Sequence, residues 1–213
     1  MPKPVVAVIT GDLVKSRSYS NHDYENILIK LSAVLDDIKS NYTGQFDVFR
    51  GDSFQFVTEN IEYAAAATVM IRLALKSHTP SVDIRQSLGI ASVASINDKV
   101  RISTGDAFIL SGEGLDSIKH NLIVLRTKNR VFNQKIELLT KFLDVHLSGL
   151  TELQSLALLA YLKHPKATHA ELGVLLNRSR LAVTKLLNMS HYALVSEYLY
   201  FYQENLPQKK DLL

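Results

Sequence analysis

The spacing of apolar residues changes near residue 130, and this change constrains the fold more than any other feature. Before it, short β-branched runs such as residues 4–10 alternate with segments whose apolar residues recur every three or four positions. From Val131 onward, only the helical spacing is found. Mixed periods indicate strands combined with helices, whereas a single helical period indicates an all-α region. We therefore predict an α+β domain over residues 1–130 and a helical domain over residues 131–213.

The first part of the chain carries the signals of a small layered fold. Strands are expected at 4–10, 46–50, 54–58, 84–93, 100–102 and 107–110, and helices at 20–42 and 60–75. Ser20 with Asp23 and the single Asn60 are helix-start signals, and Gly51-Asp52 is typical of a two-residue type II′ hairpin turn. The unbroken apolar run 4–10 favours a strand in the middle of the sheet. This order predicts a ferredoxin-like or palm-type fold, with helices on one face of an antiparallel sheet.

The second part reads as a series of helices that contains a helix-turn-helix at residues 151–190. Helices are expected from Val131 to before Ser148, at 151–163 and 168–176, from Ser179 onward, and at 192–202. Thr151 with Gln154 and Thr168 with Glu171 are capping-box pairs that open two of them. The helix after Ser179 is expected to bury an apolar face of Leu181, Val183, Leu186 and Leu187.

Composition excludes several classes of function. The chain has no cysteine, so disulfides, thiolate metal sites and a cysteine nucleophile are excluded, and a reducing compartment is favoured. A formal net charge of +3 over 213 residues is too mild for a general polyanion-coating protein. The sequence shows neither a signal peptide nor a membrane span, so we expect a cytoplasmic protein without a membrane partner.

Aspartate follows glycine at three positions of the first part, and two of these positions are expected to converge. The pairs are Gly11-Asp12, Gly51-Asp52 and Gly105-Asp106. Asp12 ends the first strand and Asp52 lies at the hairpin tip, which are neighbouring places in an antiparallel palm. Paired carboxylates at a sheet edge hold Mg²⁺, which takes its remaining ligands from water and a phosphate chain. Gly-Asp is also ordinary turn chemistry that needs no ligand, so both interpretations stay open.

The segment after Asp12 has a composition suited to phosphate. Lys15, Ser16 and Arg17 offer two cations, a hydroxyl and backbone N–H groups directly beside the first aspartate. We therefore expect these three residues to bind a nucleotide together with the metal. The seven histidines show no metal-ligand spacing.

Four motifs resemble the SatD family of bacterial proteins, a family without a settled activity, and the resemblance runs over nearly the whole chain. They are Val8-Ile-Thr-Gly-Asp-Leu-Val-Lys-Ser-Arg17, Arg50-Gly-Asp-Ser-Phe-Gln55, Leu88-Gly-Ile90 and Gly105-Asp-Ala-Phe108. The same spacing is similar to a reduced class III nucleotidyl cyclase domain. The resemblance implies that Asp12 and Asp52 are metal ligands and that Gly105-Asp106 lies near the base. Arg50 and Asp106 complete the expected nucleotide-binding set.

Two positions depart from the cyclase pattern. In active members an asparagine and an arginine on one helix stabilise the transition state, and the corresponding residues here are Ile109 and Glu113. An aliphatic group and an anion cannot offset negative charge on a phosphoryl group. We therefore expect metal and nucleotide binding without cyclase activity.

Residues 170–187 resemble the common bacterial helix-turn-helix, in which the second helix enters the major groove of double-stranded DNA. Arg178, Arg180 and Lys185 lie within eight residues that include no acid. We expect Arg180 and Thr184 to contact base edges, and Lys185 to contact the phosphate backbone. The alternative is a three-helix bundle for protein contacts, with the cations on a solvated face.

The sequence thus favours a homodimeric regulator that binds a nucleotide with Mg²⁺ and DNA. Dimerisation is expected because the final helix carries more aromatic surface than a small domain easily buries. Two alternatives remain: a Mg²⁺-dependent nucleotidyl- or phosphoryl-transfer enzyme, and a scaffold that binds only proteins.

Overall fold

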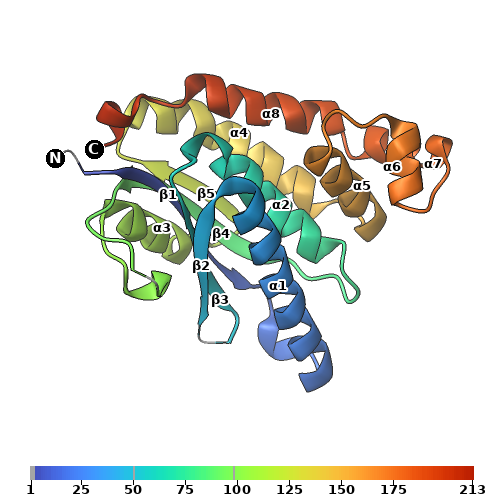
Figure 1. Ribbon diagram of the computed structural model, residues 1–213, viewed down its shortest axis with the longest axis horizontal. Helices are drawn as coiled ribbons and strands as arrows, with labels where there is room; N and C mark the ends of the chain where they lie inside the picture. Colours follow the sequence, from blue (N-terminus) through green and yellow to red (C-terminus); the bar gives the residue numbers. More distant parts are fainter. Residues whose placement is uncertain (1–2, 50, 98) are drawn as a thin grey trace.

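The structure, a computed structural model, describes residues 3–49, 51–97 and 99–213 and is built on a five-stranded sheet (Figure 1). The strands are β1 (Val5–Leu13), β2 (Gly44–Phe49), β3 (Ser53–Thr58), β4 (Ile84–Ser92) and β5 (Ile123–Thr127), in the order β2-β3-β1-β4-β5. The first strand is central, as its unbroken apolar run predicted. It is antiparallel to both β3 and β4, whereas β4 and β5 are parallel.

Eight α-helices surround or extend this sheet in the described residues. They are α1 (Asn21–Tyr42), α2 (Ala64–Lys76), α3 (Asp106–Asp116), α4 (Arg130–Ser148), α5 (Glu152–Lys163), α6 (His169–Leu175), α7 (Arg180–Met189) and α8 (Tyr192–Asn205). Short 3₁₀ helices occupy Ser16–Ser18, Ile61–Tyr63, Val100–Ile102 and Lys209–Leu212. Three predicted starts are confirmed, because the Ser20 side chain caps α1 and capping boxes open α5 and α6. The predicted fold class, a mixed α+β part followed by helices, is confirmed.

Helices cover both faces of the sheet, not one as predicted. Ala7 and Ile9 of β1 point into the large core beneath α1 and α2, whereas Val6 and Val8 point into a second cluster beneath α3. The helix α3 approaches β4 closely at Gly89, where a Cβ atom would lie 2.5 Å from the carbonyl oxygen of Ala107. The close approach requires glycine at this position.

Three local predictions are wrong, and each involves a short or ambiguous signal. Residues 100–102 form a 3₁₀ helix, and residues 107–110 belong to α3 instead of a strand. An apolar run of four residues cannot distinguish the two, and the glycines that follow lower the apparent helix propensity. Asn60 caps no helix through its side chain, which instead donates to the carbonyl oxygen of Tyr42.

One apolar core extends across the predicted boundary at residue 130. Phe132, Ile136, Leu158 and Tyr202 all belong to the same cluster as Ile9 of the central strand. The hydroxyl of Tyr202 donates to the carbonyl oxygen of Ile61 at 2.6 Å. Thus α4 and α8, which lie side by side along one edge of the molecule (Figure 1), pack with the sheet. The division of the chain into two domains stays a prediction.

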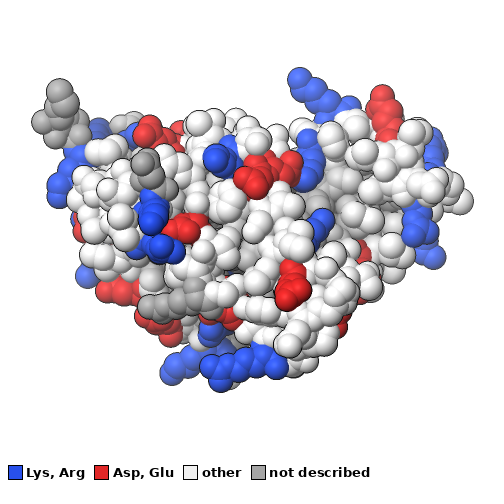
Figure 2. Space-filling model, turned by 60° about the horizontal axis from the view of Figure 1, so that its bottom comes forward, with Lys and Arg blue, Asp and Glu red and all other residues white. Residues whose placement is uncertain are grey.

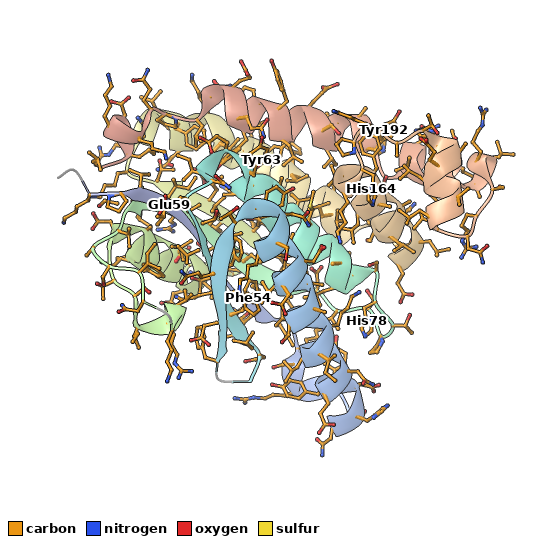
Figure 3. The ribbon with its side chains drawn as sticks, viewed as in Figure 1. Phe54, Glu59, Tyr63, His78, His164 and Tyr192 are labelled. Atoms are coloured by element: carbon orange, nitrogen blue, oxygen red, sulfur yellow. The ribbon has the colours of Figure 1, made fainter. Side chains whose placement is uncertain are left out.

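The helices α5, α6 and α7 enclose a small separate core. It consists of Ala157, Ala160, Leu172, Val183 and Leu187. Tyr192, at the start of α8, closes this core by edge-to-face contacts with Tyr161 and His169 (Figure 3). The helix α5 therefore has two packed sides, because its Leu158 and Leu159 lie in the large core. In the part of the chain that is described, no helix is both long and apolar enough to cross a bilayer.

Candidate functional site

The end of β1 lies beside the β2–β3 hairpin, so the backbones of the two predicted aspartates are neighbours. Asp12 is paired with Ser53 in the ladder, and the Leu13 N–H donates to the carbonyl oxygen of Asp52 at 3.2 Å. The strands end at Phe49 and resume at Ser53, so the connection has three residues, not the two that were predicted. Gly51 has φ of 87°, which suits glycine in the middle of this turn.

Arg85 is the functional candidate that the sequence did not identify. It stands opposite Asp12 in the β1–β4 ladder. Its Nε and terminal nitrogen donate to the two carboxylate oxygens of Asp12 at 2.8 and 2.5 Å. This is the bidentate geometry that arginine uses for carboxylates and phosphates alike. An arginine at the start of a predicted strand is unremarkable until the strand register is known.

Electrostatics confirm that several carboxylates lie near this guanidinium. The hydrogen bond with Asp12 raises the pKa of Arg85, and the negative charges of Asp52 and Asp116 raise it further. Burial, followed by the charge of Asp52, raises the pKa of Tyr24. Figure 2 shows acidic and basic side chains close to one another in the lower part of the molecule.

Tyr24 forms one wall of the cluster. A Cβ atom at Gly51 would lie 2.5 Å from the Tyr24 hydroxyl oxygen, so this hydroxyl contacts the hairpin turn. On the sheet surface, Thr10 shares a 2.8 Å hydrogen bond with Ser111 of α3. The cluster is therefore polar and lies among the hairpin, the start of α1 and the sheet.

The donor set fits a magnesium ion that is bound together with a phosphate chain. Across residues 3–49, 51–97 and 99–213, no three His, Asp or Glu side chains are grouped tightly enough to hold a metal alone. Mg²⁺ commonly takes only one or two carboxylates and keeps waters and phosphate oxygens for the rest. Asp12 and Asp52 would supply those two ligands, and the ion would neutralise phosphate charge. Asp12 must first release an oxygen from Arg85.

The other predicted nucleotide residues are less closely connected to the cluster. Lys15 and Arg17 are exposed on the turn after β1, and in the described chain neither they nor Ser16 are bonded to Asp12 or Asp52 through their side chains. Asp106 lies at the far end of β4, held by Ser92 at 2.8 Å and Lys128 at 2.6 Å. The hydrogen bond from Lys128, then that from Ser92, lowers the pKa of Asp106. Arg50 lies outside the described residues.

The helix α3 carries the two departures from the cyclase pattern on exposed positions. Ile109 and Glu113 are one turn apart, and both side chains are open to solvent. Neither provides a cation or a neutral amide to the surface above the sheet.

Two helices joined by a short turn, α6 and α7, lie within the predicted helix-turn-helix segment. The turn contains Asn177 at φ of 51°, and the Arg178 N–H donates to the carbonyl oxygen of Gly173 at 2.8 Å. Arg178, Arg180 and Lys185 are exposed, and Figure 2 shows basic side chains at this end of the molecule (right). The Thr184 hydroxyl donates to the Arg180 carbonyl and lies 2.9 Å from the His169 ring.

Leu181 was expected inside the helical core and is instead 78% exposed. It lies on the outer side of α7, one residue after Arg180. Val183 and Leu187 are four residues apart and share the buried face, whereas Leu181 is two residues before Val183 and therefore lies on the opposite side of the helix. The outer face of α7 is thus mixed apolar and basic.

Among known proteins, only solved structures are similar to this chain. No protein-family model matches the sequence, and no curated protein matches it either. Similar solved structures include the guanylyl cyclase domain of the RhoGC fusion protein from the aquatic fungus Blastocladiella emersonii, at 22% identity and a TM-score of 0.47, covering 55% of this chain and 76% of that one. The adenylyl cyclase CyaB from P. aeruginosa is 16% identical with a TM-score of 0.41, covering 60% of this chain and 78% of that one. Similarity at this level does not decide a function.

Proposed function

We propose that the cluster around Asp12, Asp52 and Arg85 binds a nucleoside polyphosphate together with Mg²⁺. The observation that carries the proposal is the strand register, in which a hairpin carboxylate and a bidentate arginine flank the carboxylate at the end of β1. A cation and two anions in one cluster match a ligand that is itself an anion carrying a divalent metal. The SatD resemblance of the sequence agrees with this proposal and remains a prediction.

We expect Arg85 to exchange its partner, the carboxylate of Asp12, for a phosphate group when the nucleotide binds. In the free protein its guanidinium neutralises Asp12, which lowers the cost of placing several carboxylates together. A phosphate chain offers the guanidinium an equivalent bidentate partner, and the metal then takes its place on the carboxylate. Metal and nucleotide are therefore expected to bind together. The phosphate chain takes Arg85 away from Asp12, and the metal ion then neutralises the carboxylate of Asp12.

The first test is the melting temperature of the protein with Mg²⁺ or Mn²⁺ and a nucleoside triphosphate. A ligand that binds only the folded state adds about 2.7 kcal/mol to the free energy of unfolding when its concentration is a hundred times its dissociation constant. The melting temperature rises as a result. Asp12→Asn and Asp52→Asn should each abolish the shift, whereas Arg85→Ala should abolish the response to nucleotide. Each variant is compared with its own ligand-free melting temperature, since loss of the Asp12–Arg85 pair also changes stability.

Asp36→Asn is the matched control, because Asp36 is an exposed carboxylate on the outer side of α1. It should respond as the wild type does. If Asp12→Asn and Asp52→Asn also respond as the wild type does, the carboxylates are turn residues and the nucleotide proposal fails.

We propose further that α6 and α7 bind double-stranded DNA, which would make the protein a nucleotide-responsive regulator. Support comes from the two helices and the short turn between them, and from the exposed cations at Arg178, Arg180 and Lys185. The enzyme alternative would require product formation at the carboxylate site, and the scaffold alternative would require neither ligand to bind.

A further inference from the structure

The outer face of α4 is apolar in its second half, and Val131 lies beyond the exposed Gln134 and Lys135 at its start. Val131, Leu138, Phe142 and Val145 are 62%, 61%, 68% and 71% exposed. The opposite face of the same helix, which includes Phe132, Ile136, Leu143 and Leu147, is buried against the sheet. A helix that covers a sheet in a monomer normally presents polar residues to solvent. This one is apolar on two sides.

A groove lies next to this stripe, between α4 and α8. It has a volume of about 620 Å³, and its apolar lining includes Leu139, Leu143, Leu194, Val195 and Phe201. Leu194 is itself 63% exposed. The stripe and the groove form one continuous surface, which we call the α4–α8 face. It offers a ridge, at Phe142 and Val145, directly beside a hollow.

The aromatic side chains of α8 do not make up this surface to the extent predicted. Tyr202 is fully buried, and burial raises the pKa of Tyr198, whose hydroxyl is bonded to Thr140, to about 12. These rings pack within their own chain. The apolar excess lies instead on α4.

The size of the α4–α8 face is that of an interface core. Five apolar side chains at these exposures leave roughly 500 Å² of apolar surface in one patch, near the upper end for a monomer. A standard interface buries roughly 800 Å² on each partner, including a polar rim. The patch therefore suffices for the centre of a stable contact between proteins.

The spacing along α4 identifies the occupant as another helix. Val131, Leu138 and Val145 are seven residues apart, and Phe142 follows Leu138 by four, which is the heptad pattern of a helix–helix seam with Lys135 as its one polar position. The rim carries both signs of charge, because Glu137 and Lys141 form an ion pair at 2.5 Å. A two-fold axis that crosses α4 between Leu138 and Phe142 brings Glu137 of one copy closest to Lys141 of the other. A ridge beside a groove is likewise self-complementary under such an axis.

We propose that the α4–α8 face binds a second copy of this chain, with the two α4 helices packed antiparallel across a two-fold axis. The dimer depends on neither the nucleotide site nor the DNA surface. The residues that carry it are Leu138, Phe142 and Val145, with Glu137 and Lys141 at the rim.

The first experiment measures the mass of the full chain by sedimentation over a range of concentrations. The wild type should sediment as twice 23.8 kDa. Phe142→Glu and Val145→Lys should each raise the dimer dissociation constant at least tenfold while the circular dichroism spectrum stays unchanged. Tyr200→Glu is the matched control, since Tyr200 is 63% exposed on the side of α8 away from the groove, and it should leave the dimer intact. A wild type that stays monomeric at 100 µM, or a dimer that resists both α4 substitutions, overturns the proposal.

The second experiment tests the two-fold arrangement. Glu137→Lys should weaken the dimer, and the double variant Glu137→Lys with Lys141→Glu should restore it. Because the chain has no cysteine, single-cysteine variants also report orientation. Leu138→Cys lies near the axis and should form a disulfide-linked dimer under mild oxidation, whereas two copies of Val131→Cys would be about 27 Å apart along the helices and should not. Equal cross-linking of both variants indicates parallel helices and overturns the antiparallel dimer.

Discussion

Arg72 makes more charged contacts than a buried side chain usually does, and it ties α2 to α4. Its guanidinium is fully buried and binds Asp83 at 2.7 Å, Asp144 at 2.5 Å and Ser148 at 2.7 Å. Burial acts to raise the pKa of Asp83, but the hydrogen bond and charge of Arg72, with Lys76, lower it below its ordinary value. The carboxylate form of Asp83 therefore stabilises the folded chain.

We predict that Asp83→Asn lowers the free energy of unfolding by about 3 kcal/mol at neutral pH, because it leaves a buried guanidinium partly unpaired. Since the folded-state pKa is below the unfolded one, this contribution is complete above the unfolded value of about 3.9 and is lost as the pH falls through the folded pKa. Urea unfolding of both proteins checks it: the difference should be constant from pH 7 to pH 5 and should narrow below pH 4.

The control for this measurement is Asp37→Asn, which removes a surface pair with Lys163. It should cost less than about 1 kcal/mol. If Asp83→Asn costs no more than the control, or if its effect is unchanged at acidic pH, the Arg72–Asp83 pair contributes no net stability.

Ile109 and Glu113 lead to a prediction about chemistry at the same scale. Purified protein should form no cyclic nucleotide from ATP or GTP with Mg²⁺ or Mn²⁺, because neither side chain can offset charge on a transferring phosphoryl group. Chromatography of the reaction mixture after long incubation measures it. Product that disappears in Asp52→Asn would restore the enzyme alternative to first place.

Among single residues, the sequence predicted the carboxylates and missed their partner. Asp12 and Asp52 follow glycines at the ends of recognisable strands, so their proximity follows from the hairpin and the central strand. Arg85 meets Asp12 only because β4 pairs with β1 in one particular register, and register depends on long-range pairing that a local pattern does not contain. Asp106, which local sequence also selected, lies at the opposite end of β4.

At the scale of elements, well-capped helices were predictable and the segment from α3 to β5 was not. Ser20, Thr151 and Thr168 each cap a helix at the predicted position, because capping is a contact between residues three apart. The strand β5 has five residues and pairs in parallel with β4 across α3. Such a strand is stabilised mainly by pairing with a strand that is distant in the sequence, so its own amino-acid composition is a weak predictor of strand structure.

The proposed DNA binding by α7 is tested by measuring affinity at several salt concentrations. Binding to duplex DNA should weaken steeply with ionic strength, and Lys185→Ala should reduce the slope of log affinity against log salt by about 1, because one phosphate contact is lost. Arg180→Ala should in addition reduce preference among sequences, since we expect it to read a base edge. Salt titrations on genomic fragments measure both.

Lys119→Ala is a suitable comparison, because Lys119 is an exposed cation on the α3–β5 connection, far along the chain from α7. It should leave the slope unchanged. Absence of binding at low salt, or variants that bind as the wild type does, would make α6 and α7 a protein-interaction module. A loss of sequence preference in Lys185→Ala but not in Arg180→Ala would reverse the expected roles.

For the whole molecule, the change of pattern near residue 130 predicted the order of fold classes, but not how the two parts pack. Ile136 and Tyr202 are apolar or aromatic residues on helices, and nothing local says that they share a core with the central strand β1, more than a hundred residues earlier. Their burial follows from the need of α4 and α8 to cover an apolar face that the first part leaves open.

The two packed sides of α5 fix α7, the proposed recognition helix, relative to the sheet. One side of α5 packs in the core of the sheet and the other side packs against α6 and α7, so no flexible segment separates these helices from the sheet. Lys163 of α5 also forms an ion pair with Asp37 of α1 at 2.5 Å. In a symmetric pair of such chains, the separation of the two recognition helices would be a constant of the protein, set by its rigid frame. Such a pair would bind only DNA whose two half-sites are separated by the same distance as the two α7 helices. If the half-sites were one helical turn closer or farther apart, one copy would bind but the other would not.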